Sequence, residues 1–105
     1  MLPSLAAALG AQSTGAALLG GVTDPLGGAV ERARVEVSNL ATGLRVETVT
    51  GEGGLYQFPG LPAGLYRVEV TRAGFVRLLR EPVTLRVGDR ARLDLELRLE
   101  GVSGG

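Results

Sequence analysis

Hydrophobic and polar residues alternate along most of the chain, with the period of two that is typical of half-buried β-strands. The clearest run covers residues 54–70, where the polar residues Gln57, Arg67 and Glu69 separate the apolar ones. Proline and glycine at positions 59–64 supply turn chemistry in the middle of this run. The pattern therefore predicts a β-hairpin. Its inward-facing residues are expected to be Tyr56, Phe58, Tyr66, Val68 and Val70.

The same alternation, with turn residues between the runs, predicts about seven strands and no helical period beyond the first residues. The expected strands cover residues 17–23, 33–39, 44–50, 55–58, 65–72, 77–87 and 91–99. The sixth is interrupted at Glu81–Pro82, because a proline fits a sheet edge or a bulge, where no ladder N–H is needed. We therefore expect an all-β fold, an antiparallel Ig-like β-sandwich, with a small open barrel as the alternative.

This assignment of faces defines an expected core and an expected set of turns. The core is expected to contain Val35, Val37, Tyr56, Phe58, Leu61, Tyr66, Val68, Val70, Phe75, Leu93, Leu95 and Leu97, with Phe75 folding back as a plug. The turn residues are expected to be Asp24, Pro25, Gly27, Gly43, Gly54, Pro62, Gly64, Gly74 and Gly88. Proline presets φ at a turn position, and glycine accepts the positive φ that tight turns require.

Composition excludes most catalytic chemistry. The 105 residues are enough for one domain, and eleven basic and eleven acidic residues give a net charge of zero. All the basic residues are arginine, and lysine, cysteine, histidine and tryptophan are absent. Ordinary zinc sites, histidine-assisted nucleophiles and lysine-based catalysis therefore lack their residues. We expect no catalytic, cofactor-binding or metal-binding residue, and zero net charge removes the electrostatic argument for nucleic acid or an anionic membrane as a partner.

The two ends of the chain differ in composition from the rest. Residues 1–12 are apolar and rich in alanine, and Ala8–Gly10 has the small-x-small form of a secretory cleavage site. We expect a signal-peptide remnant there, with a flexible leader as the alternative because no basic segment precedes it. Residues 100–105 are typical of a flexible tail or linker. No run approaches the roughly 20 apolar residues of a membrane-spanning helix.

Several short motifs, in order over residues 20–99, resemble the carboxypeptidase regulatory-like domains, which are transthyretin-like sandwiches related to the C-terminal domain of metallocarboxypeptidases. The motifs are Asp-Pro-x-Gly within residues 21–27, Asn-x-x-Thr-Gly within 33–43, Gly-x-Tyr-x-Phe within 50–58, and residues 61–66, 73–75 and 83–88. They are most similar to the N-terminal module of Oar-type TonB-dependent outer-membrane receptors. Two turns depart from the family pattern: residues 31–33 replace Pro-Gly-Ala, and residues 52–54 replace Asp-x-x-Gly.

The resemblance implies a non-catalytic module over residues 16–99, an interaction or spacer domain of a TonB-dependent receptor in the periplasm or at the outer membrane. Its partners would be other domains of the same polypeptide or another cell-envelope protein. The zinc ligands and catalytic glutamate of metallocarboxypeptidases belong to a separate domain, so the resemblance transfers no chemistry. Two alternatives stay open: a carbohydrate-binding module, and an accessory domain of a secreted metallocarboxypeptidase.

Three further candidate sites each have a simpler structural interpretation. Charged residues expected on outer sheet faces could form a docking surface, but cross-strand pairs on a solvated face also explain them. These residues are Arg67, Glu69, Arg92, Asp94, Glu96 and Arg98. Asp24, Glu52 and Asp89 could bind Ca²⁺ if their turns met, although acidic residues commonly form turns. A sugar site needs exposed aromatic rings, and the four aromatic residues are expected in the core.

Overall fold

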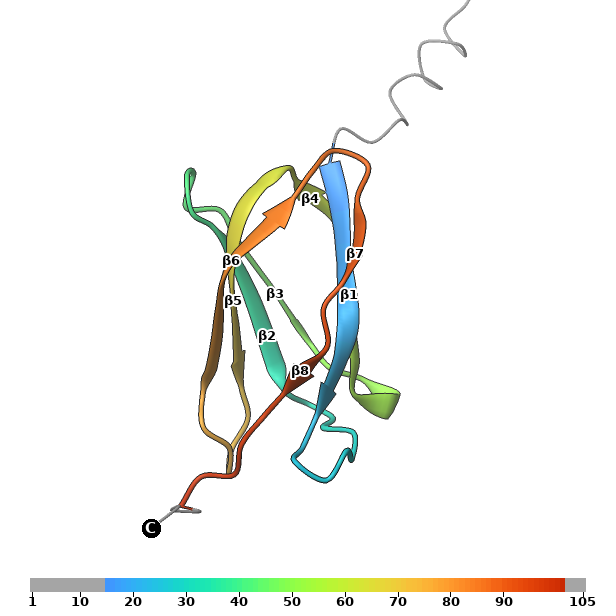
Figure 1. The fold of residues 1–105 in the computed structure, drawn as a ribbon, viewed down its shortest axis with the longest axis vertical. Helices are drawn as coiled ribbons and strands as arrows, with labels where there is room; N and C mark the ends of the chain where they lie inside the picture. The colour runs from blue at the N-terminus through green and yellow to red at the C-terminus, as the bar shows by residue number, and fades with distance from the viewer. Residues whose placement is uncertain (1–14, 102–105) are drawn as a thin grey trace, which may run out of the picture.

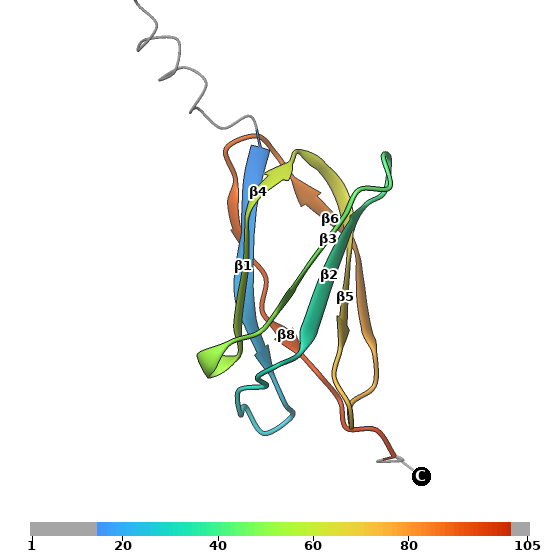
Figure 2. The same cartoon turned by 180° about the vertical axis from the view of Figure 1, so that it is seen from behind.

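The computed structural model, which describes residues 15–101, has eight strands in two sheets that pack face to face (Figure 1 and Figure 2). The strands are β1 (Gly15–Thr23), β2 (Arg34–Asn39), β3 (Arg45–Val49), β4 (Leu55–Pro62), β5 (Gly64–Thr71), β6 (Leu78–Leu85), β7 (Arg90–Arg92) and β8 (Leu95–Glu96). One sheet has the order β4-β1-β7, with β8 also paired to β1, and the other has the order β3-β2-β5-β6. The expected all-β sandwich is therefore confirmed. The segments at residues 1–12 and 102–105 lie outside the described residues.

The core lies between the two sheets and is built from the inward face of each strand. Tyr56, Phe58 and Tyr66 have exposed fractions of 4%, 2% and 0%, so the three rings fill the interior. Phe75 and Leu93 were predicted in the core but are only half-buried and pack against it, because Phe75 lies in a loop and Leu93 lies in the gap between β7 and β8. The buried apolar residues are Ala16, Leu18, Val22, Val30, Ala33, Val35, Val37, Tyr56, Phe58, Leu61, Tyr66, Val68, Val70, Leu85, Leu95 and Leu97.

The predicted hairpin over residues 54–70 is wrong. β4 pairs with β1 in one sheet, whereas β5 pairs with β2 and β6 in the other. The segment is therefore an arch that crosses from sheet to sheet, and Pro62 and Gly64 are strand ends with Ala63 alone between them. Alternation indicates which side of a strand is apolar, but it does not indicate which strand is the neighbour.

The last predicted strand, over residues 91–99, is divided into β7 and β8. Both pair with β1 in parallel and in one register, since Ala17 lies opposite Arg90 and Val22 lies opposite Leu95. These parallel pairs are a departure from the antiparallel pattern that the sequence predicts. Gly20 and Gly21 of β1 lie between the residues that pair with β7 and the residues that pair with β8.

After β8 the chain leaves β1 and crosses to the loop between β5 and β6 (Figure 1). Phe75 forms a bridge with Leu99, and the Val76 N–H donates to the Arg98 carbonyl at 2.8 Å. The bridge therefore joins the loop between β5 and β6 to the segment after β8, and from this loop the Phe75 side chain packs against the core without entering it. The C-terminal segment closes this side of the sandwich.

The interruption predicted at Glu81–Pro82 does not divide the strand, because β6 runs unbroken from Leu78 to Leu85. β6 is an edge strand, and its register against β5 shifts between Tyr66 and Val68. Pro82 is tolerated there because an edge strand leaves one row of backbone groups without a ladder partner. No helix within residues 15–101 is long and apolar enough to cross a membrane.

Candidate functional site

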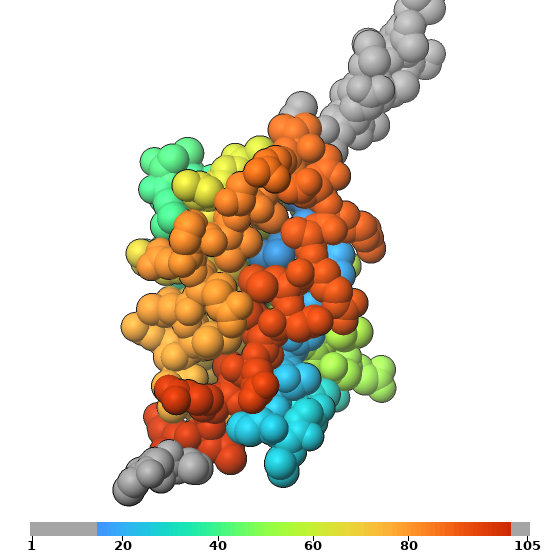
Figure 3. All heavy atoms as spheres, viewed as in Figure 1, coloured from blue at the N-terminus to red at the C-terminus, as the bar shows by residue number. Residues whose placement is uncertain are grey.

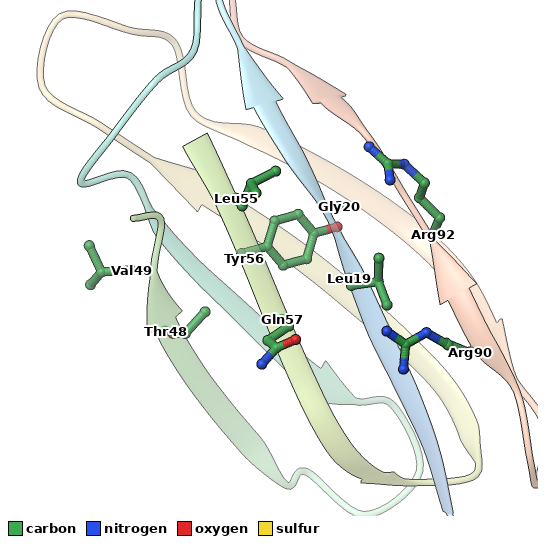
Figure 4. A pocket seen from close by; sticks show the side chains of 9 residues that line it. All are labelled: Leu19, Gly20, Thr48, Val49, Leu55, Tyr56, Gln57, Arg90 and Arg92. Carbon is green, nitrogen blue, oxygen red and sulfur yellow. The ribbon is translucent and has the colours of Figure 1, made fainter. Parts of the chain in front are cut away.

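A groove of about 450 Å³ lies along β4, β1 and β7 and extends past the β4 edge to Thr48 and Val49 of β3 (Figure 4). Leu19 is its centre, with Gln57 beside it on β4 and Arg92 beside it on β7. The groove therefore has an apolar floor between an amide and a guanidinium. Its lining residues are Leu19, Gly20, Thr48, Val49, Leu55, Tyr56, Gln57, Arg90 and Arg92.

Beneath the groove, the Tyr56 side chain passes across Gly20 to the opposite edge of the sheet. Its hydroxyl donates to the Leu93 carbonyl at 2.5 Å, where β7 and β8 separate. Gly20 leaves the space for this contact, because a Cβ there would lie 1.9 Å from the Leu93 oxygen and 3.0 Å from the Tyr56 hydroxyl. Tyr56 is thus a structural tie between β4 and the last segment.

The Asp94 carboxylate joins the same edge of the sheet from the solvent side. It accepts the Gly21 N–H at 2.9 Å and the Arg92 Nε–H at 3.1 Å. These two donors lower the pKa of Asp94, the arginine contributing most. A side-chain oxygen therefore binds the backbone donor of β1 in the gap between β7 and β8.

We expect stability to fall at alkaline pH because burial, and secondarily the Asp94 charge, raise the pKa of Tyr56 to about 12. Tyrosine in an unfolded chain titrates near 10, so between about pH 10 and 12 the unfolded chain loses a proton that the folded chain keeps. This contribution to the free energy of unfolding is complete below about pH 10 and decreases as the pH rises. Tyr56→Phe should cost about 1–2 kcal/mol at neutral pH and remove part of the alkaline decrease. Urea unfolding of both proteins across this range measures it, and an identical alkaline decrease would assign the effect to another group.

A second hollow, of about 580 Å³, lies between the turn after β1 and the C-terminal segment, which run side by side in Figure 3. Leu26 at the tip of the turn is 97% exposed. Val76 and Leu99 add exposed apolar surface, and Glu96 and Arg98 lie at the border. The hollow is therefore bordered by two connecting segments and by Glu96 of β8.

The acidic residues considered for Ca²⁺ do not come together. Asp24 follows β1, whereas Asp89 lies beside the start of β1, where its carbonyl accepts the Ala17 N–H. The Asp24 carboxylate accepts the N–H groups of Leu26 and Gly28 at 2.9 and 2.8 Å. Residues 15–101 contain no group of three acidic residues that could hold a metal ion. Asp24 and Asp89 are explained by the turns that they close.

Four of the charged residues considered for a docking surface form ion pairs with residues on the neighbouring strand or loop, or within their own segment. Arg67 Nε lies 3.0 Å from Glu81, and Arg77 lies 3.2 Å from Glu69. Exposed pairs of this kind contribute a few tenths of a kcal/mol each. Their geometry is that of a solvated sheet face.

Two buried polar residues were not identified from the sequence. Thr50 is 2% exposed; its hydroxyl donates to the Val30 carbonyl at 2.7 Å and accepts the Ala33 N–H at 2.8 Å. Asn39 is 5% exposed and caps the turn after β2 by accepting the N–H groups of Ala41 and Thr42. Asparagine at a strand end before Thr-Gly was the available signal, whereas nothing near Thr50 indicated its distant partners.

The comparisons with known proteins concern the whole sandwich. A sequence profile of the carboxypeptidase regulatory-like domain matches residues 17–98. No curated protein sequence is similar enough to count as a relative.

Solved structures share the fold at low sequence identity. The Bacillus anthracis TIE protein matches with a TM-score of 0.70 and 23% identity, over 82% of this chain and 17% of its own. A Bacteroides uniformis protein whose proposed role is carbohydrate binding matches with a TM-score of 0.64 and 18% identity, over 78% of this chain and 40% of its own. Catechol 1,2-dioxygenase from Acinetobacter radioresistens matches with a TM-score of 0.67 and 14% identity, over 87% of this chain and 54% of its own. The chain thus spans well under two thirds of each of these proteins.

Proposed function

Because the chain belongs to the carboxypeptidase regulatory-like domain family, we propose that it acts as a non-catalytic accessory module, an interaction or spacer domain of a larger cell-envelope protein. The proposal depends on the two packed sheets, which form a rigid body that could separate or contact neighbouring domains. The lining of the groove beside Leu19 includes no acidic residue, so it offers no carboxylate that could act as a general base.

The path of the chain through the sandwich carries the proposal. β1 begins at one end of the long axis, and the segment after β8 leaves at the opposite end (Figure 1). A domain with this path, placed in series with others, holds its neighbours apart by its own length. The bridge from Phe75 to Leu99 fixes the direction in which the last segment leaves.

The same proposal assigns the module to a TonB-dependent outer-membrane receptor, with the sandwich in the periplasm or at the outer membrane. Support comes from the motifs at residues 24–27, 39–43 and 54–58, which resemble the N-terminal modules of such receptors. The apolar residues 1–12 support export. Partners would then be the other domains of that polypeptide or a neighbouring envelope protein.

Fractionation of the source cells tests this assignment. An antibody against the domain should detect a polypeptide several times longer than 105 residues in the outer-membrane fraction. Peptide sequencing of that band should identify a plug and a barrel, and the mature N-terminus should lie near Ala11 or Gln12. A zinc-peptidase domain in the band would favour the peptidase alternative, and a cytosolic protein that retains Met1 would contradict export.

Carbohydrate binding is the second candidate, favoured by the groove and by the proposed role of the Bacteroides uniformis neighbour. Gln57, Arg90 and Arg92 could donate hydrogen bonds to sugar hydroxyls over the apolar floor. Tyr56 lies beneath the groove at 4% exposure, so no ring is presented for stacking. Binding on a glycan array that is lost in Gln57→Ala, with an unchanged circular dichroism spectrum, would establish this function; no binding by the wild-type protein would remove it.

A further inference from the structure

The four sheet edges of the sandwich are not equally protected. β4 contains Pro59 and Pro62, and its register against β1 shifts. β6 contains Pro82 and a second register shift. The edge at β7 and β8 is broken where Asp94 binds β1. Prolines, bulges and breaks of this kind discourage pairing with another chain.

Within residues 15–101, β3 is the edge that has none of these features. Its register with β2 is unbroken from Arg45 to Val49, and the strand contains no proline or glycine. Solvent reaches both of its faces, because Val46 is 37% exposed on the inner side and Glu47 and Val49 are exposed on the outer side. The opposite sheet covers this strand only in part, since β4 lies near it and Thr48 is half-buried.

The hydrogen bonds at its two ends determine which backbone groups of β3 point outward. The Asn39 N–H donates to the Leu44 carbonyl, and the Thr50 N–H donates to the Ala33 carbonyl, each at 2.8 Å. Hydrogen-bonded and non-bonded pairs alternate along an antiparallel ladder. Positions 44, 46, 48 and 50 therefore bond to β2. The N–H and C=O groups of Arg45, Glu47 and Val49 point away from it.

We propose that β3 pairs in antiparallel fashion with β3 of a second copy of this chain, centred on Val46. In this register Arg45 of each copy lies opposite Glu47 of the other, in hydrogen-bonded positions, so the pairing forms two cross-strand ion pairs. Val46 lies opposite its own counterpart in the non-bonded position, where side chains approach most closely. The β3-β2-β5-β6 sheet of one copy and the same sheet of the other copy then become one sheet of eight strands.

The charges select both the partner and the register. Arg45 makes no salt bridge within the described residues, and the Glu47 carboxylate, which lies 2.8 Å from Arg34, is still 49% exposed. A register centred on Glu47 would place two carboxylates opposite each other, which is unfavourable. A strand of five residues buries little area, so the dimer is expected to be weak, forming between about 0.02 and 1 mM.

Complementary charge reversals test the proposal by sedimentation over this concentration range. The wild-type protein should shift from monomer to dimer. Arg45→Glu leaves two acidic residues on β3, and Glu47→Arg leaves two basic ones, so each variant alone should dimerise at least about tenfold more weakly. An equimolar mixture of the two should form a heterodimer, because both cross-strand pairs then combine opposite charges.

Arg86→Glu is the matched control, since it makes the same charge change in the turn after β6 and should dimerise as the wild type does. Circular dichroism verifies that each variant is folded. A wild-type protein that stays monomeric over the whole concentration range would overturn the proposal. The partner of the β3 edge would then be an extended segment of another protein. A dimer that Arg45→Glu does not weaken, or variants that do not combine when mixed, would overturn the register.

Discussion

Replacing Gly20 with alanine is expected to abolish the native fold or to destabilise it by more than about 3 kcal/mol. The added Cβ would lie 1.9 Å from the Leu93 oxygen and 2.6 Å from its carbonyl carbon. Both atoms belong to the backbone, so the last segment would have to separate from β1 to make room. That separation would also break the hydrogen bond from Tyr56 to Leu93. Chemical denaturation monitored by circular dichroism measures the loss.

Gly21→Ala is the matched control, one residue along the same strand but on its outer face. Its Cβ would meet the Leu55 side chain at 3.6 Å, an ordinary van der Waals distance. We expect a change within about 1 kcal/mol. Similar losses in the two variants would show that the two glycines matter through the backbone entropy of β1 and not through the close approach of Leu93.

Phe58→Ala is expected to lower the free energy of unfolding by about 3–5 kcal/mol. The ring is 2% exposed and lies 6.0 Å, centroid to centroid, from the Tyr56 ring. Truncation removes the ring from the centre of the core and leaves a cavity that the surrounding strands can fill only in part. Urea unfolding of the variant and the wild type gives the difference.

Gln57→Ala provides the comparison for this measurement, because Gln57 is adjacent in sequence and faces solvent on the same strand. Its substitution should change stability by no more than about 0.5 kcal/mol. A loss below about 1 kcal/mol for Phe58→Ala would mean that the ring does not fill the core, and the assignment of faces along β4 would be wrong.

The side on which each residue lies was predictable from the sequence, because alternation is a local property of a strand. Tyr56, Phe58, Tyr66 and Val68 lie inside, as the pattern in residues 54–70 indicates. The pairing of strands was not predictable in the same way. The single residue Ala63 between β4 and β5 suggested a hairpin, yet each strand finds its partners elsewhere in the chain.

The candidate groove could not be predicted, because its walls come from four separate segments. Leu19, Gln57 and Arg92 become neighbours only through the pairing of β1 with β4 and β7. The contact of Tyr56 with Leu93 and the close approach at Gly20 depend on the same pairings. Alternation did not predict the break in the last strand, since Leu93 and Asp94 continue it without fault.

The parallel pairing of β1 with β7 and β8 has a consequence for biosynthesis. The first and last strands meet across 73 residues of sequence, as between Gly21 and Asp94. One sheet is therefore incomplete until the end of the domain has been synthesised, and contacts of such long range form slowly. A chain leaving the ribosome could not complete this sheet until its last strand emerged, whereas the strands of the other sheet are all synthesised before β7. Completion of the sandwich would then be a late step, which follows the synthesis of the last strand.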